Sequence, residues 1–312
     1  MRVSGCTRQW DRGLGRPVCA AVSYCPVIIT KFNEILTGLD EALEFAKSLP
    51  VKVAGSRFEL YRDPIAAWVE KHIPERSLPP DRDDGLDSIA LSESMELAQD
   101  IVPFLRGEDP KIAKEKLGHI FRGKHKPGED DHNESMARNI AFEVAFAAVC
   151  RRAGLDTRLE EPDVVVRLGQ RKILIACKRP FGAPGVEANI TGARDQIEKH
   201  LTPSGDRGAI AISLSRVVVP LDTWLRGRDA ADLDRQLDAR VVQGVERHRH
   251  HCQEHVPAAM VGGVIFHASC VGFEPKRYIY LGASRLYRLG TGKTASSRLF
   301  DKLGKRLEKA DL

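Results

Sequence analysis

Residues 161–180 read EPDVVVRLGQRKILIACKRP, and this stretch decides the architecture of the second half of the chain. It contains two apolar runs of strand length, Asp163–Leu168 and Lys172–Lys178, separated by a turn that contains Gly169. A glycine between two runs rich in Val and Ile is typical of a β-hairpin. We therefore predict two neighbouring strands, with the first residue of one close to the last residue of the other.

Side chains on the second strand alternate between two faces, so Leu174, Ala176 and Lys178 share one of them. A lysine at the end of such an apolar strand is poorly placed for solubility alone. Two interpretations stay open. Lys178 lies either in a plain salt bridge with Asp163 on an edge strand, or with Asp163 in a functional site.

Helical and strand-like patterns alternate on both sides of the hairpin. We expect helices at 136–153, 188–201 and 231–250, and further strands at 157–160, 209–214, 261–268 and 277–282. Such alternation indicates an α/β domain in which helices cover a sheet.

The first half of the chain has a helical pattern, with apolar residues at helical spacing over 31–49 and a Pro-rich, charged linker over 74–85. We divide the chain into four parts: 1–26, a leader that is either disordered or an artefact of start-codon choice; 27–130, a helical domain; 131–284, the α/β core; and 285–312, a basic C-terminal helix. Residues 285–309 contain eight Lys or Arg and two acidic residues.

The composition is that of a chain with a buried core: 312 residues, of which 42% are hydrophobic and 29% charged. A net charge of +5 is compatible with a polyanionic partner but does not require one. Seven cysteines without a CxxC pair favour a reducing cytoplasm. Prolines interrupt the apolar stretch 17–30, and no run is long enough to span a membrane, so we expect a cytoplasmic protein without a membrane partner.

Glu143 lies in the predicted helix 136–153. At helical spacing it shares a face with apolar residues, namely Ile140, Phe146, Ala147 and Cys150. A carboxylate on such a face is buried and needs a partner. The alternative is a glutamate at the margin of the stripe that reaches solvent.

A helix with Glu143, a Pro-Asp pair at a strand start and a strand that ends in Lys178 together resemble the PD-(D/E)xK nuclease superfamily, also called the restriction-endonuclease-like fold. The resemblance covers 133–215. The segments that match best are Glu161-Pro-Asp163 and Ile175-Ala-Cys-Lys-Arg-Pro180. It implies an αβββαβ core with a mixed sheet, preceded here by the helical region.

The resemblance also implies a Mg²⁺ or Mn²⁺ ion held by Glu143, Asp163 and the backbone carbonyl of Cys177. Lys178 would orient or activate the attacking water. Gln196 resembles the helix glutamine that many members of the superfamily aim at the active site, although an ordinary surface glutamine is the alternative.

Two arginines are candidate phosphate contacts, because a guanidinium can grip a phosphate in two places. These are Arg179, which follows the hairpin lysine, and Arg194 on the predicted helix 188–201. We expect nucleic acid as the partner, DNA before RNA, and leave a homodimer open.

Ala176 departs from the superfamily pattern, which has Asp or Glu two residues before the lysine. We prefer Glu143 as the replacement carboxylate, and Glu187 swinging into the vacant space is the alternative. A third interpretation is a core that binds nucleic acid but cleaves it poorly. The sequence thus predicts a metal-dependent nuclease, with a noncatalytic nucleic-acid-binding or scaffold protein as the alternative.

Overall fold

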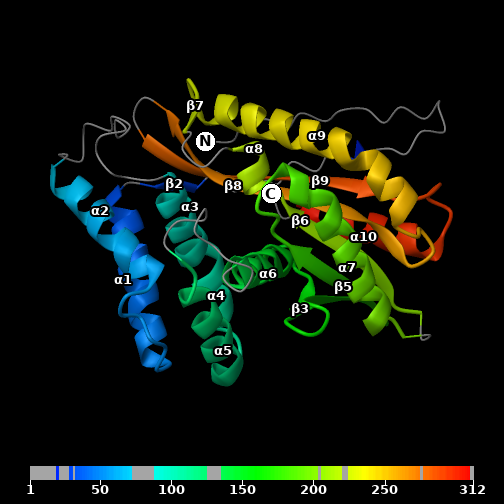
Figure 1. The fold of residues 1–312 in the computed structure, drawn as a ribbon, viewed down its shortest axis with the longest axis horizontal. Coiled ribbons are helices and arrows are strands. Elements are labelled where there is room, and N and C mark those ends of the chain that lie inside the picture. The colour runs from blue at the N-terminus through cyan, green and yellow to red at the C-terminus, as the bar shows by residue number, and fades with distance from the viewer. Residues whose placement is uncertain are drawn as a thin grey trace.

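The computed structural model describes residues 19–20, 28–30, 32–71, 88–124, 135–202, 205–219, 224–274 and 277–309. The predicted linker at 74–85 lies outside these residues. In the described part, a curled mixed sheet of nine strands lies between two layers of helices (Figure 1). The predicted α/β class with an N-terminal helical region is confirmed.

The predicted hairpin forms the centre of the fold. Strands β4 (Val164–Leu168) and β5 (Arg171–Lys178) are antiparallel, with Val164 opposite Ile175. Gly169 has a φ of +65°, the left-handed conformation that glycine adopts at low cost in a tight turn. The glycine in the turn and the two apolar runs therefore predicted the hairpin that the structure contains.

Neighbouring elements follow in the order helix, three strands, helix, strand. Helix α6 (Ser135–Arg152) is followed by β3 (Asp156–Arg158), which is antiparallel to β4. After β5, helix α7 (Val186–His200) leads into β6 (Arg207–Ser213), which is parallel to β5. The predicted order αβββαβ is thus present in the chain.

The sheet continues beyond β6 with two long strands. Helix α9 (Ala230–His255) leads into β8 (Val261–Glu274), which is parallel to β6, and β9 (Arg277–Arg288) returns antiparallel to β8. The short elements β7 (Leu225–Arg226), which pairs with β8, and α8 (Ser215–Val218) lie nearby.

Both ends of the chain differ from the prediction. Strands β1 (Cys19–Ala20) and β2 (Ile28–Thr30) pair with β9, so residues 19–20 of the expected leader belong to the sheet. The rest of that leader lies outside the described residues. The C-terminal helix α10 covers only Ala295–Lys309, because the residues from 285 to 288 complete β9.

One face of the sheet is covered by α6, α10 and the helices of the first half of the chain. The latter comprise α1 (Phe32–Ser48), α2 (Arg57–Lys71), α3 (Ser88–Glu96), a π-helical turn (Leu97–Ile101), α4 (Val102–Leu105) and α5 (Pro110–Phe121). A single apolar cluster contains Leu39 of α1, Phe142 of α6 and Ile175 of β5. The boundary predicted near residue 130 therefore does not divide the core.

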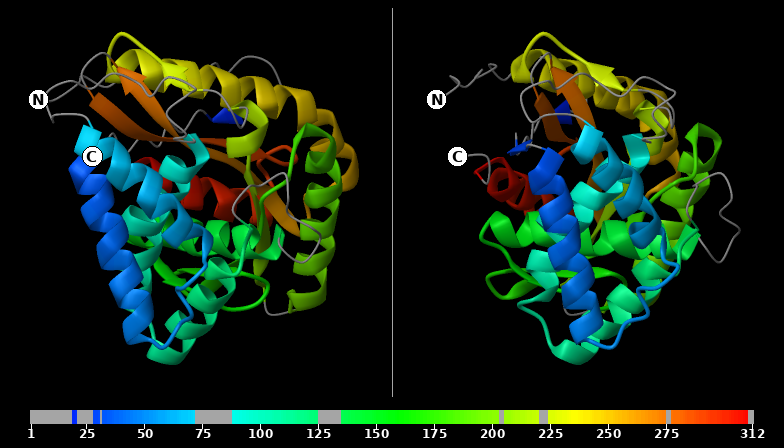
Figure 2. Two further views of the ribbon diagram at one scale, coloured as in Figure 1. Left: turned by 60° about the vertical axis from the view of Figure 1, so that its left-hand side comes forward. Right: turned by 90° about the vertical axis from the view of Figure 1, so that its left-hand side faces the viewer.

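The opposite face of the sheet carries α7, α8 and α9. Ala176, Ile190 and Leu237 belong to the second apolar cluster, which fills this side. The two views in Figure 2 show α9 along one side of the sheet and the helices of the first half on the other. Among the described residues, no helix combines the length and apolar character needed to cross a bilayer.

Candidate active site

The candidate site lies where β4 begins and β5 ends. Asp163 immediately precedes β4, and Lys178 is the last residue of β5. Because the two strands are antiparallel, both side chains lie at one end of the hairpin, with Lys178 Nζ 3.8 Å from Asp163 Oδ2. The predicted proximity of these two residues is confirmed.

Both oxygens of the Asp163 carboxylate accept hydrogen bonds. The backbone N–H of Cys177 donates to Oδ2 at 2.7 Å, and Gln196 Nε2 donates to Oδ1 at 3.0 Å. Burial raises the pKa of Asp163, while the charge of Lys178 and these hydrogen bonds oppose the rise. The carboxylate is therefore held in one orientation at a largely dry position.

Gln196 joins the parts of this site from helix α7. Its Oε1 accepts a hydrogen bond from Lys178 Nζ at 2.5 Å, and its Nε2 also donates to the Pro162 carbonyl at 2.7 Å. One half-buried amide thus contacts the aspartate, the lysine and the backbone before β4. The interpretation of Gln196 as an ordinary surface residue is wrong.

Glu143 approaches from helix α6 and is 6% exposed, so the predicted inward orientation is confirmed. Burial raises its pKa to about 7, against the effect of the Lys116 ammonium, and the charges of Asp163 and Glu161 raise it further. Since the charge of Asp163 acts on Glu143, the carboxylates of α6 and of the hairpin share one electrostatic environment.

Lys116 of helix α5 is the part of the site that the sequence analysis missed. Its Nζ lies 2.6 Å from Glu143 Oε1. Lys116 is spaced three residues after Ala113 and four before Ile120, and both of these are buried. A lysine at the margin of an apolar helix face was the available signal, although nothing in the sequence pointed to the α6 glutamate as its partner.

Ala176 occupies the position where the superfamily pattern has an acidic residue. It is fully buried in the apolar cluster that also contains Ile190 and Ala193 of α7. Glu187 does not fill this position, because its carboxylate faces α9, with Oε1 3.4 Å from His248 Nδ1. Of the two replacements considered, only Glu143 lies at the site.

Arg179 does not have the predicted freedom to contact a phosphate. Its side chain is buried, and Nη1 donates to Glu96 Oε2 at 2.9 Å. Arg194 is engaged within the protein as well: its Nε donates to Asp195 Oδ1 at 2.8 Å and its Nη1 to the His255 carbonyl at 2.9 Å.

Arg179 belongs to a buried ionic cluster beside the site. At its centre, Glu93 lies 2.9 Å from Arg57 Nε and 2.7 Å from Arg138 Nε. Burial alone would raise the pKa of Glu93, but Arg57 and the neighbouring arginines lower it below its ordinary value. These pairs join α2, α3 and α6 at the end of β5, and so hold the helical region against the site.

The donor atoms at this site suit Mg²⁺ better than Zn²⁺. Among the described residues, no three or more His, Cys, Asp or Glu side chains are grouped as a metal site. Magnesium needs only one or two carboxylates because it keeps several waters. Glu143 and Asp163 are such a pair, and each has one lysine beside it, Lys116 at Glu143 and Lys178 at Asp163.

Cys177 supplies a further oxygen on the same side. In an antiparallel ladder, the N–H and C=O groups of one residue point toward the same neighbouring strand. The Cys177 N–H points to Asp163, so its carbonyl also faces the start of β4. Pro162, opposite Cys177 when the register is extended, has no N–H to donate to that carbonyl.

Comparisons of this chain with protein-family models, with curated proteins and with solved structures find no match.

Proposed function

We propose that this chain is a Mg²⁺- or Mn²⁺-dependent nuclease with a restriction-endonuclease-like core that hydrolyses phosphodiester bonds of DNA. One observation carries the proposal: Asp163, Lys178 and Gln196 are joined by hydrogen bonds and an ion pair at one end of the hairpin, and the buried Glu143 of α6 is near enough for the charge of Asp163 to act on it. Buried carboxylates with raised pKa values beside a lysine are typical of functional sites.

The topology around the site supports the same proposal. The strand that ends in Lys178 is antiparallel to the strand that follows Asp163, and parallel to β6 across α7. Glu143 and Gln196 then approach from opposite faces of the sheet. This is the arrangement that the resemblance to the PD-(D/E)xK superfamily implies.

In the proposed reaction, Glu143, Asp163 and the Cys177 carbonyl would hold the ion. When bound, Mg²⁺ would supply polarisation of the phosphate and a lowered pKa of an attacking water. Lys178 places its ammonium beside Asp163, where it orients the water and offsets the charge that develops on the phosphate oxygens. Gln196 keeps Lys178 and Asp163 at a fixed separation, so little reorganisation is needed during the reaction.

A second candidate function is that of a noncatalytic nucleic-acid-binding or scaffold protein. Two observations favour it: Ala176 is part of the apolar core, and Lys116 already neutralises Glu143. In this case the cluster at the hairpin end is a structural ion-pair network. Carboxylate-dependent binding of Mn²⁺ would exclude this candidate.

The test is incubation of the purified chain with circular DNA, linear DNA and RNA in Mg²⁺, in Mn²⁺ and in EDTA. Asp163→Asn keeps the size of the side chain and should abolish cleavage without unfolding the chain. Asp63→Asn is the matched control, because Asp63 is 84% exposed on α2. Cleavage that persists in EDTA, or in Asp163→Asn, would overturn the proposal.

A further inference from the structure

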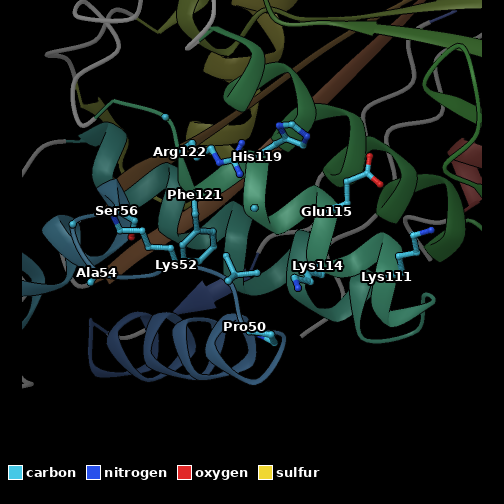
Figure 3. A pocket seen from close by; sticks show the side chains of 14 residues that line it. Pro50, Lys52, Ala54, Ser56, Lys111, Lys114, Glu115, His119, Phe121 and Arg122 are labelled. Carbon is cyan, nitrogen blue, oxygen red and sulfur yellow. The ribbon is translucent and has the colours of Figure 1, made fainter.

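A basic pocket of about 650 Å³ lies between helix α5 and the loop of residues 50–56. Its charged lining consists of Lys52, Lys111, Lys114, Arg122, His119 and a single acidic residue, Glu115. Figure 3 shows Lys114, His119 and Arg122 along α5, with Lys52 and Ser56 on the loop. Four permanent cations thus face one carboxylate.

The four permanent cations of the basic pocket are not paired within the described structure. The side chains of Lys52, Lys111, Lys114 and Arg122 form no ion pair or hydrogen bond with any described residue. Lys116 on the flank of the same helix, by contrast, is paired with Glu143. The pocket therefore presents uncompensated positive charge, which attracts an anion.

Gly118 gives the basic pocket an open wall. It lies inside α5, where glycine costs roughly 1 kcal/mol of helix stability relative to alanine. Packing does not require this glycine, since a Cβ at position 118 would meet nothing within 4 Å. A glycine with this cost and no packing reason suits a surface that another backbone approaches closely.

A buried guanidinium lies directly behind another wall of the basic pocket. A Cβ at Gly123, which lines the pocket, would lie 2.0 Å from Arg57 Nη1. Arg57 is 1% exposed, and its Nη1 has no hydrogen-bond partner among the described residues. Its Nε is paired with Glu93, so Arg57 gives this wall an unbonded N–H donor and no uncompensated charge.

The basic pocket and the candidate active site are on two sides of one helix. Lys114 lines the pocket, and Lys116, two residues later, reaches Glu143. The helix diameter of roughly 10–12 Å therefore separates them. From Lys111 to Arg122 the pocket follows α5 for roughly 16 Å, which is long enough for several consecutive phosphates of one strand.

We propose that the basic pocket binds backbone phosphates of the nucleic acid that the candidate active site would cleave. This inference rests on the proposed nuclease function for the identity of the strand, while the binding itself can be measured without cleavage. Lysine and arginine contact phosphates whatever the base sequence is. The pocket would therefore increase the affinity and fix the position of the strand, but give no sequence preference.

A charge series at Gly118 tests the proposal, because the position has room for a side chain. We would measure binding of a fluorescent DNA duplex by anisotropy in EDTA, with Asp163→Asn as the parent. Gly118→Lys should tighten binding, and Gly118→Glu should weaken it roughly tenfold, because a charge is added within reach of the phosphates. Gly118→Gln matches the size of Glu and should stay close to the parent.

A neutralised triple variant, Lys111→Gln, Lys114→Gln and Arg122→Gln, provides the second arm. For this variant, the slope of log Kd against the logarithm of the salt concentration should become smaller by roughly two to three. Each lost phosphate contact reduces that slope by about one. The matched control replaces Arg228, which lies just before α9, and Arg235 and Arg249 of α9 by Gln; all three are exposed. Melting temperatures verify that every variant is folded.

Unchanged affinity and salt slope in the pocket variants would overturn the proposal. Binding of pyrophosphate to the pocket would also overturn it if the pocket variants had no effect on DNA binding. The ligand of the pocket would then be a small anion. Absence of cleavage by the wild-type chain, with pocket-dependent DNA binding intact, would overturn the nuclease function and leave the pocket assignment standing.

Discussion

At the scale of single residues, the site depends on contacts between side chains far apart in the sequence. Asp163 and Lys178 could be paired from the sequence because one short hairpin joins them. Lys116 could not be assigned to Glu143, since the contact depends on how α5 packs against α6. Arg179 could not be recognised as buried, because its partner Glu96 is 83 residues away.

Ala176 leads to the first prediction. Ala176→Glu should lower the melting temperature in EDTA, because the position is fully buried and a larger, charged side chain costs on the order of 1–3 kcal/mol or more. Position 176 lies opposite Asp163 when the register is extended, so Mn²⁺ should restore part of the lost stability. The measurement is thermal unfolding with and without Mn²⁺.

Ala176→Gln is the control for Ala176→Glu, because it keeps the size and removes the charge. It should be destabilised, with no recovery in Mn²⁺. Equal destabilisation of both variants under all conditions would mean that position 176 is only core packing and that the proposed register of the active site is wrong.

His267 leads to the second prediction, which concerns pH. Burial, with the charges of Arg179 and Arg152, lowers its pKa to about 4, whereas an unfolded histidine has a pKa of about 6.5. Between these values the unfolded chain binds a proton that the folded chain does not. The free energy of unfolding should therefore fall as the pH drops from about 6.5 to 4, by about 3 kcal/mol from this residue.

His267→Gln should remove this share of the pH dependence, while the Gln side chain can still bond to Ser284 Oγ, 2.9 Å from His267 Nδ1. Urea unfolding at pH 7.5 and 4.5 gives the difference for each protein. His250→Gln is the control, because His250 is 79% exposed on α9. The same pH dependence in His267→Gln and wild type would contradict the assignment.

At the scale of elements, the helices and strands whose apolar residues recur at a clear spacing could be predicted from the sequence, and the others were missed. The spacing in α6 indicated a buried face that includes Glu143. Residues 141–150 are in fact buried on every side of the helix, because α6 lies between the sheet and the helical region. Strands β1 and β2 have two and three residues, too few for any periodicity. The predicted end of β9 was too early, because the buried Arg285 interrupts an apolar run and is paired with Asp238.

Helix α10 leads to the third prediction. Its apolar side, which includes Phe300 and Leu303, is buried, whereas Arg298, Lys302, Lys305 and Arg306 are exposed. Deletion of the tail would remove core residues, so substitution is the proper test. Lys302→Gln, Lys305→Gln and Arg306→Gln together should weaken DNA binding at all sequences and flatten the salt slope by roughly two to three units.

The variant with Arg228, Arg235 and Arg249 replaced by Gln is again the control. If the α10 variant retains the salt slope of the wild type, the basic face of α10 is a solvated surface that does not contact phosphate. A change confined to certain DNA sequences would likewise contradict backbone contact.

At the scale of the whole molecule, the helical region and the sheet share one apolar cluster, which leads to the fourth prediction. Because one apolar cluster contains residues of α1, α6 and β5, separate unfolding of the helical region would expose α6. We expect a single calorimetric transition whose van't Hoff and calorimetric enthalpies agree. Two resolved transitions would show that the division predicted near residue 130 is physical.

Strands β1 and β2 have a consequence for the behaviour of the chain in concentrated solution. Without them, β9 would be the outermost strand over its 12 residues, with a row of free N–H and C=O groups. Such an edge is a template for amyloid-like association between molecules. Pairing at Tyr278–Tyr280 and Leu286–Tyr287 blocks both ends of that row. Strands β1 and β2 thus leave less of this edge open to pairing between molecules.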